Sequence, residues 1–87
     1  MNILRVSGSS IPSKVAGAIA GVMRDRGHVV VQAIGASAVN QSVKAIAVAR
    51  GYLQEDGIEI IFIPEMVDVE INNQVRTALK FSVERRG

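Results

Sequence analysis

Cysteine and tryptophan are both absent from the 87-residue chain. Without cysteine the chain can form neither a disulfide nor a thiolate metal site, and this composition suits a reducing cytosol. Aromatic residues make up only 3% of the sequence, so close-packed aliphatic side chains have to build the core. No apolar run approaches the roughly 20 residues of a membrane-spanning helix, and no signal peptide is evident. We therefore expect a cytoplasmic protein.

The chain does have a large apolar fraction and a nearly balanced charge. Hydrophobic residues make up 48% of the sequence, which indicates a globular chain. Its length predicts one domain over residues 1–87. A domain of this size hides only about 60–65% of its unfolded surface, so a thin core and a homo-oligomer, dimer or tetramer, are expected. Ten basic and eight acidic side chains give a net charge of +2, which permits a polyanionic partner without requiring one.

Periodic apolar residues predict most of the secondary structure. Pro12 suits the first turn of a helix, because its missing N–H has no partner there. Gly27 and Gly51 are expected to end the two helices, and Pro64 is expected to end the third strand. The expected strands are residues 3–7, 28–34 and 58–63, and the expected helices are residues 12–26 and about 37–50.

Two further alternating segments, residues 67–71 and 75–83, flank residues 72–74 and predict a hairpin. Directly opposed residues in a hairpin must point to the same face of the sheet. A two-residue loop would place charged Glu70 opposite apolar Val75. A three-residue loop places Ile71 opposite Val75. We therefore predict the three-residue loop.

We take the element order as β-α-β-α-β-β. With right-handed crossovers both helices lie on one face of a four-stranded mixed sheet, so the fold class is α/β, in the form of a two-layer α+β sandwich. The residues expected to face the helices are Val29, Val31, Ala33, Ile58, Ile60 and Phe62. The opposite face is expected to carry Val30, Ile34, Ile61 and Ile63. No helix covers that face, which suggests a partner surface, although scattered exposed aliphatic residues are common.

Catalytic chemistry has few candidate residues. His28 is the only histidine, and it is expected to be exposed at the start of a strand. The acidic residues show neither paired-carboxylate nor metal-ligand spacing. The segment from Gly8 to Val15 matches a phosphate-binding P-loop only in outline, because it lacks the glycine before Lys14 and the hydroxyl residue after it. We expect no enzymatic activity, no cofactor and no metal.

A weaker signal remains at the start of the first predicted helix. Ser9, Ser10, Ser13 and Lys14 lie near the helix N-terminus, where anions are favoured. The plain alternative is that one of these serines caps the helix.

Basic and amide side chains are the candidates for contact with nucleic acid. They are Arg5, Lys14, Asn40, Lys44, Arg50 and Arg76. Lys14 and Lys44 are the strongest, because each falls in the first or second turn of a predicted helix, where a phosphate also meets free N–H groups. Arg50 has an alternative role at a helix C-terminus, and Arg76 has one in a cross-strand pair with Glu70. Since few aromatic side chains are free to stack on bases, we expect contacts with phosphates.

Three long segments resemble the stage V sporulation protein S (SpoVS) family. They are VAGAIAGVMRDRG (residues 15–27), QAIGASAVNQSVKAIAVARG (residues 32–51) and IEIIFIP (residues 58–64). Members of that family influence sporulation, septation and coat assembly, and no enzymatic activity is attached to them. The family resembles Alba, an archaeal chromatin protein of the same element order that binds DNA or RNA and forms dimers. The resemblance implies an Alba-like fold, a homo-oligomer and DNA or RNA as partner.

The sequence departs from Alba at several contact positions. Serines stand in the first loop where Alba has lysines, Ala36 follows Gly35 where Alba has an arginine, and the hairpin tip is not basic. Arg50 does match a basic position at the end of Alba's second helix. The resemblance therefore implies a weaker or more selective contact than duplex coating. A protein–protein adaptor without nucleic-acid binding, and a small anion bound at the Gly35 turn, are the alternatives.

Overall fold

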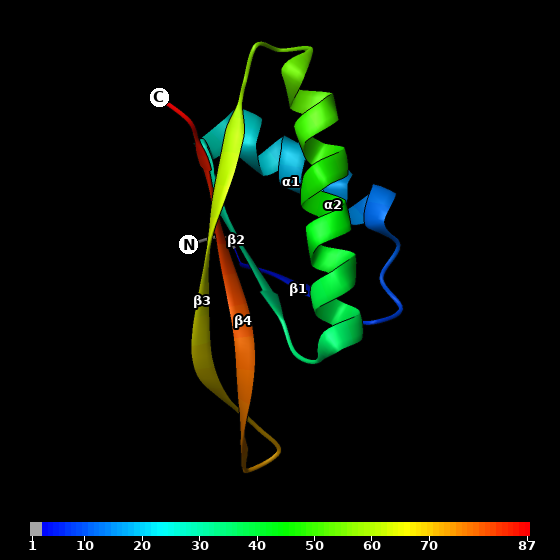
Figure 1. Cartoon of the computed structure of the whole chain (residues 1–87), viewed down its shortest axis with the longest axis vertical. Helices are drawn as coiled ribbons and strands as arrows, with labels where there is room; N and C mark the ends of the chain where they lie inside the picture. The colour runs from blue at the N-terminus through cyan, green and yellow to red at the C-terminus, as the bar shows by residue number, and fades with distance from the viewer. Residues whose placement is uncertain (1–2) are drawn as a thin grey trace.

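The structure is a computed structural model and describes residues 3–87. Its elements are β1 (Ile3–Val6), α1 (Pro12–Arg26), β2 (His28–Ala33), α2 (Ala36–Gln54), β3 (Ile60–Ile71) and β4 (Gln74–Arg85). The strands form one mixed sheet in the order β1-β2-β4-β3, in which only β1 and β2 are parallel. Both helices lie on one face of this sheet (Figure 1). The predicted β-α-β-α-β-β order and two-layer architecture are confirmed, although the sequence pattern showed five strand segments and the sheet has four strands.

The helix ends agree with the sequence prediction for α1 but not for α2. Gly27 ends α1 in the left-handed conformation, and its N–H donates to the Met23 carbonyl oxygen at 2.9 Å. Neither helix has a side-chain N-cap, so the alternative in which a serine caps the first helix is wrong. α2 continues through Gly51 to Gln54, because it buries Leu53 completely. That burial outweighs the cost of about 1 kcal/mol for one glycine within a helix.

The sequence predicted that Pro64 ends the third strand, but the strand continues beyond it. β3 runs through it without interruption as far as Ile71. β3 is the edge strand next to β4, and at an edge the missing N–H of proline removes no hydrogen bond of the ladder. The two strand segments predicted on either side of Pro64 are therefore one strand.

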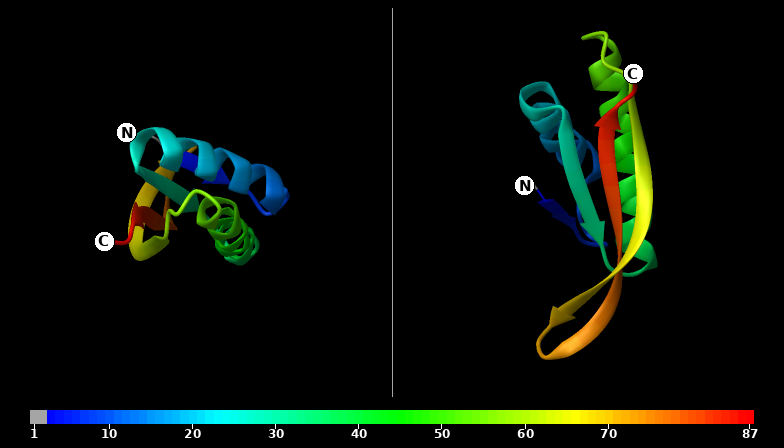
Figure 2. Two further views of the ribbon diagram at one scale, coloured as in Figure 1. Left: turned by 90° about the horizontal axis from the view of Figure 1, so that it is seen from above. Right: turned by 90° about the vertical axis from the view of Figure 1, so that its left-hand side faces the viewer.

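The hairpin loop has two residues, so the prediction of a three-residue loop is wrong. Ile71 pairs with Gln74, and Arg76 pairs with Val69 and not with Glu70. Asn72 and Asn73 have φ angles of 52° and 63°, as a type I′ turn requires. In this register each face of the hairpin carries both apolar and charged residues. The fold tolerates this mixture, because this end of the hairpin projects beyond the helices and neither face is covered (Figure 2).

The turn geometry predicts a stabilising substitution at the hairpin tip. Replacing Asn73 by glycine is expected to raise the free energy of unfolding by about 0.5–1 kcal/mol, because glycine adopts positive φ without strain. Urea denaturation of the two proteins measures the difference. Gln74→Gly, one residue beyond the turn, is the control and is expected to destabilise the strand. An equal effect of the two changes would contradict a tip limited by backbone strain.

The core lies between the helices and the inner face of the sheet. Val29, Val31 and Ala33 are buried there as predicted, and so are Ile58 and Ile60. On the outer face, Ile61 and Ile63 are exposed as predicted, and Ile34 is partly buried.

Two residues differ from these expectations. Val30 is only 2% exposed although no helix covers it, because Ile3 and Ser82 flank it on the adjacent strands. Phe62 lies on the helix side of the sheet, since it pairs with the buried Val83, but it is 36% exposed.

Candidate nucleic-acid interface

The loop between β1 and α1 is held against the start of α2. The Ser7 N–H donates to Ser10 Oγ at 2.9 Å, and Gln41 Nε2 of α2 donates to the Ser10 carbonyl oxygen at 3.0 Å. A Cβ atom at Gly8 would lie 2.8 Å from Ser37 Oγ, so glycine permits this close approach. The first residues of the two helices therefore lie on the same side of the molecule.

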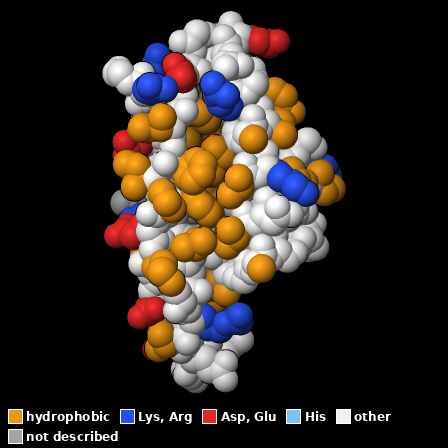
Figure 3. Space-filling view, in the orientation of Figure 1, with side chains coloured by type: hydrophobic (Ala, Val, Ile, Leu, Met, Phe, Trp, Pro, Cys, Tyr) orange, Lys and Arg blue, Asp and Glu red, His pale blue; other side chains and the backbone are white. Residues whose placement is uncertain are grey.

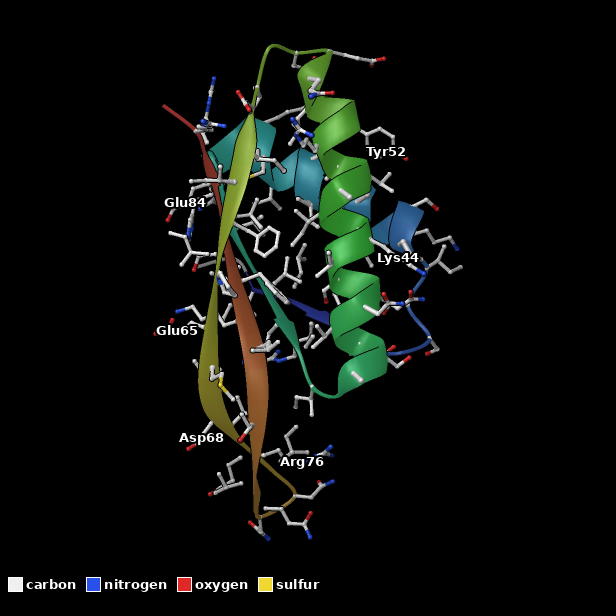
Figure 4. All side chains as sticks on the ribbon, in the orientation of Figure 1. Lys44, Tyr52, Glu65, Asp68, Arg76 and Glu84 are labelled. Carbon is white, nitrogen blue, oxygen red and sulfur yellow. The ribbon has the colours of Figure 1, made fainter. Side chains whose placement is uncertain are left out.

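Two of the predicted lysines flank this loop. Lys14 is in the first turn of α1, and Lys44 lies on α2 three residues after Gln41. Asn40 and Lys44 share one side of α2, because residues four apart are neighbours on a helix surface. All three predicted contact residues are exposed, and Figure 4 shows Lys44 pointing away from the sheet. We refer to Lys14, Asn40 and Lys44 as the lysine edge.

The sequence predicted that free backbone N–H groups lie next to both lysines, and the structure shows few such groups there. α2 begins at Ala36, so Lys44 is its ninth residue and lies in the third turn. The prediction of the first or second turn is wrong for Lys44, because the helix starts earlier than its polar residues suggest. At the start of α1, the Lys14 N–H already donates to the Ile11 carbonyl oxygen at 3.0 Å, and Pro12 has no N–H. The lysine edge therefore offers mainly ammonium groups to an anion.

The five basic residues predicted to contact nucleic acid have no ion-pair partner within residues 3–87. The ion pairs found there are Arg24–Asp56, Arg26–Asp25, Lys80–Glu65 and Arg86–Glu59. None of them includes Arg5, Lys14, Lys44, Arg50 or Arg76. The charges of these five side chains are therefore available to an external anion.

The structure does not bring the five basic residues into one patch. Arg5 points away from the helices, because its neighbours Leu4 and Val6 face the core. It lines a hollow of about 180 Å³ together with Gln32 and with residues near the hairpin tip. Arg76 lies in the projecting end of the hairpin, and Arg50 lies beside an apolar groove. Figure 3 shows the basic side chains as separate groups with apolar surface between them.

The projecting part of the hairpin, residues 67–78, is termed the arm. β3 contributes Asp68 and Glu70 to it, whereas β4 contributes only Arg76 as a basic residue. Thr77 Oγ1 donates to Asp68 Oδ1 at 3.3 Å. The arm therefore has an excess of negative charge, which opposes close contact with phosphates.

A groove of about 380 Å³ lies between α2 and β3, and we refer to it as the α2–β3 groove. Its lining residues are Val43, Ile46, Ala47, Arg50, Ile60, Ile61 and Phe62. From the sequence we expected the partner surface on the outer face of the sheet, and this groove was not predicted. The spacing of Val43, Ile46 and Ala47 does indicate a second apolar side of α2, but only the tertiary structure brings Phe62 next to it.

The described residues contain few groups suited to catalysis. His28 is exposed at the start of β2, as predicted. Within residues 3–87, no three histidine, cysteine, aspartate or glutamate side chains are grouped closely enough to hold a metal ion. Over the same residues, neither helix has the length and apolar character needed to cross a membrane.

A family model described as stage V sporulation protein S (SpoVS) matches residues 2–86. The chain belongs to the SpoVS family. Among solved structures, this SpoVS protein is similar to Alba from Thermoplasma volcanium, with a TM-score of 0.62 and 17% sequence identity. The match covers 97% of this chain and 100% of that chain. At this identity the likeness shows the fold alone, and it confirms the Alba-like fold that the sequence resemblance implied.

Proposed function

We propose that this SpoVS-family protein is a non-catalytic, cytoplasmic regulator that influences sporulation or development by binding DNA or RNA. We also propose that it acts as a homo-oligomer, a dimer or a tetramer. The observation that carries nucleic-acid binding is the lysine edge, where Lys14 and Lys44 lie on neighbouring helices without ion-pair partners among the described residues. The regulatory role follows from membership of the family.

Phosphates are the chemical group that the lysine edge suits best. An ammonium group is a compact cation that binds phosphate without reading a base. The serine hydroxyls of the neighbouring loop and the Asn40 amide add neutral hydrogen-bond donors. Base stacking has little support, because Tyr52 lies on another part of α2, Phe62 lies in the α2–β3 groove and Phe81 is buried. Arg5, Arg50 and Arg76 have weaker support because they lie apart from this edge.

A salt titration tests this proposal with duplex DNA and with RNA. We expect the affinity of the wild-type protein to fall steeply as salt rises, because each lysine–phosphate contact releases counterions. Lys14→Ala/Lys44→Ala is expected to bind more weakly, and the slope of log K against log salt should be shallower by about two for each copy in contact. Fluorescence anisotropy with labelled oligonucleotides measures both quantities.

Arg26→Ala/Arg86→Ala is a matched control, because it changes the net charge equally. Both side chains are 66% exposed and lie in ion pairs away from the lysine edge. We expect the salt slope of this variant to stay close to that of the wild type. Absence of binding at low salt, or equal loss in the two double variants, would overturn the assignment of the lysine edge.

The second candidate function is a protein–protein adaptor that does not bind nucleic acid. The α2–β3 groove favours it, because the lining of this groove is apolar except for Arg50. In that case the titration would show no binding to either nucleic acid at any salt concentration.

A further inference from the structure

The hollow that Arg5 lines lies where the arm bends toward the carboxyl ends of β1 and β2. In the right-hand view of Figure 2 the arm bends toward the side of the sheet on which β1 lies. Val6 is the last residue of β1 and Ile34 follows β2, and both line the hollow together with Val69 of the arm. In sheets that are covered by helices, ligands commonly bind outside the carboxyl ends of parallel strands.

Three polar side chains line this hollow, namely Arg5, Gln32 and Glu70. Arg5 and Gln32 are partners in adjacent strands, and both point away from the helices because their neighbours in the sequence face the core. Lys80, which is the partner of Gln32 in β4, forms an ion pair with Glu65 at 3.6 Å. Within residues 3–87, neither Arg5 nor Glu70 belongs to an ion pair, although both line the same hollow. Their charges are therefore available to a ligand in the hollow.

The rest of the lining is aliphatic and comes from Val6, Ile34, Val69 and Ile71. The volume of about 180 Å³ is smaller than the roughly 300–1,000 Å³ of pockets for drug-sized ligands. It suits one planar ring system and not a whole nucleotide. Aliphatic side chains can contact the flat faces of such a ring while the three polar side chains reach its edges.

We infer that the hollow binds a single unpaired guanine base, and this inference rests on the proposed binding of nucleic acid. The O6 and N7 atoms of guanine both accept hydrogen bonds, and an arginine such as Arg5 can donate to the two atoms at once. On the Watson–Crick edge, N1–H and the N2 amino group are adjacent donors, and the two oxygens of the Glu70 carboxylate can accept from both. The Gln32 amide supplies a further donor for O6.

The Glu70 carboxylate gives the hollow its selectivity among the bases. Adenine and cytosine carry an acceptor nitrogen beside the amino group on this edge, and uracil and thymine carry one N–H between two carbonyl groups. The carboxylate would face a lone pair in each of these bases, whereas it faces only donors in guanine. Since base pairing occupies the same edge, the guanine must be unpaired, as in a single strand or a loop.

The hollow and the lysine edge lie at the same end of the sheet. β1 leads into the loop before α1 and β2 leads into α2, so both helices begin where the hollow lies. Lys14 and Lys44 would then hold phosphates of the strand while the hollow holds one base. The negative charge of Glu70 opposes a phosphate but favours the donor edge of a neutral base. This form of recognition requires no exposed aromatic side chain.

Fluorescence anisotropy with labelled single strands of oligoadenylate tests the inference. The strands differ at one central position, which carries guanine, adenine, hypoxanthine or 7-deazaguanine. We expect the wild-type protein to bind the guanine strand about tenfold more tightly than the adenine strand, which is the size of discrimination that one bidentate base contact gives. Hypoxanthine lacks the N2 amino group and 7-deazaguanine lacks the N7 acceptor, so each should show a smaller preference over adenine than guanine does.

Two variants assign the contacts to atoms. Glu70→Ala is expected to remove the difference between guanine and hypoxanthine, and Arg5→Ala the difference between guanine and 7-deazaguanine. Both residues are exposed, so the circular dichroism of the variants should match that of the wild type. Asp68→Ala and Arg76→Ala are matched controls, because they make the same changes in charge on the arm without lining the hollow. They should retain the preference for guanine even where the affinity for every strand changes.

The outcomes separate this inference from the proposed function. Salt-dependent binding with equal affinity for guanine and adenine would overturn the hollow alone, and so would equal losses of preference in the variants and their controls. Lys14→Ala/Lys44→Ala is expected to weaken binding to every strand and to keep the preference for guanine. Absence of binding to all four strands at low salt would overturn the proposed function and this inference with it.

Discussion

Replacing Leu53 by alanine is expected to lower the free energy of unfolding by about 3 kcal/mol, near the middle of the range for a buried leucine. Leu53 is completely buried in the last turn of α2. Its carbonyl oxygen also accepts hydrogen bonds from the Ile58 N–H at 2.9 Å and the Asp56 N–H at 3.0 Å. Truncation leaves a cavity where the helix turns back toward β3. In a domain of this size, the melting temperature should fall by roughly 15 °C.

Gln54→Ala is the control for this prediction. Gln54 is the next residue of α2 and is exposed, so its truncation should change the free energy of unfolding by less than about 0.5 kcal/mol. Urea denaturation followed by circular dichroism measures both variants, at a fixed protein concentration because an oligomer would make stability concentration-dependent. Similar losses in Leu53→Ala and Gln54→Ala would mean that the end of α2 is frayed and not packed.

Replacing Ala49 by leucine is expected to cost about 2–3 kcal/mol through overpacking, in the upper part of the range for enlarged core residues. Ala45 and Ala49 on α2 and Ala16 on α1 are completely buried, and Ala20 is 1% exposed. Small side chains on both helices leave no space for a larger residue. The added atoms must push α2 away from its neighbours or force strained rotamers.

Ala18→Leu is the matched control, because Ala18 lies on the exposed side of α1. Both changes add the same atoms to an alanine within a helix, so their helix propensities nearly cancel. Thermal denaturation is expected to show a marked loss for Ala49→Leu and little change for Ala18→Leu. If Ala49→Leu melted at the wild-type temperature, the helices would be more loosely packed than the burial of these alanines indicates.

Local signals in the sequence predicted α1 and the two parallel strands well. Pro12 and Gly27 set the ends of α1 through backbone geometry, and these effects act within one turn. The same rules failed at Gly51 and Pro64, where packing of Leu53 and the edge position of β3 decide the outcome. A single-residue preference of about 1 kcal/mol is small beside the burial of a leucine.

The hairpin shows a different limit of sequence pattern. Alternating apolar residues were interpreted as one buried face, and this interpretation set the predicted loop length. The arm has no buried face along most of its length, so the alternation places no constraint on its register. The turn chemistry of Asn72 and Asn73 decides the register instead.

The candidate contact residues were chosen from the sequence by charge and by their place near helix starts. Lys14 and Lys44 lie on either side of one loop because α1 packs against α2, and a hydrogen bond from Gln41 to Ser10 holds the loop there. Arg50 belongs beside an apolar groove because β3 and α2 are adjacent in space. The sequence identifies the charged residues, but only the tertiary structure shows which of them lie on the same surface.

Composition and periodicity alone were enough to determine the two helices, the aliphatic core and the two-layer architecture, because these depend on local backbone preference and on burial of apolar residues. Family membership could also be recognised from the sequence. The tertiary structure alone decided the length of α2, the continuity of β3, the hairpin register and the position of the uncovered apolar surface. Each of these depends on contacts between residues far apart in the chain, and their energies exceed the local preferences that a sequence displays.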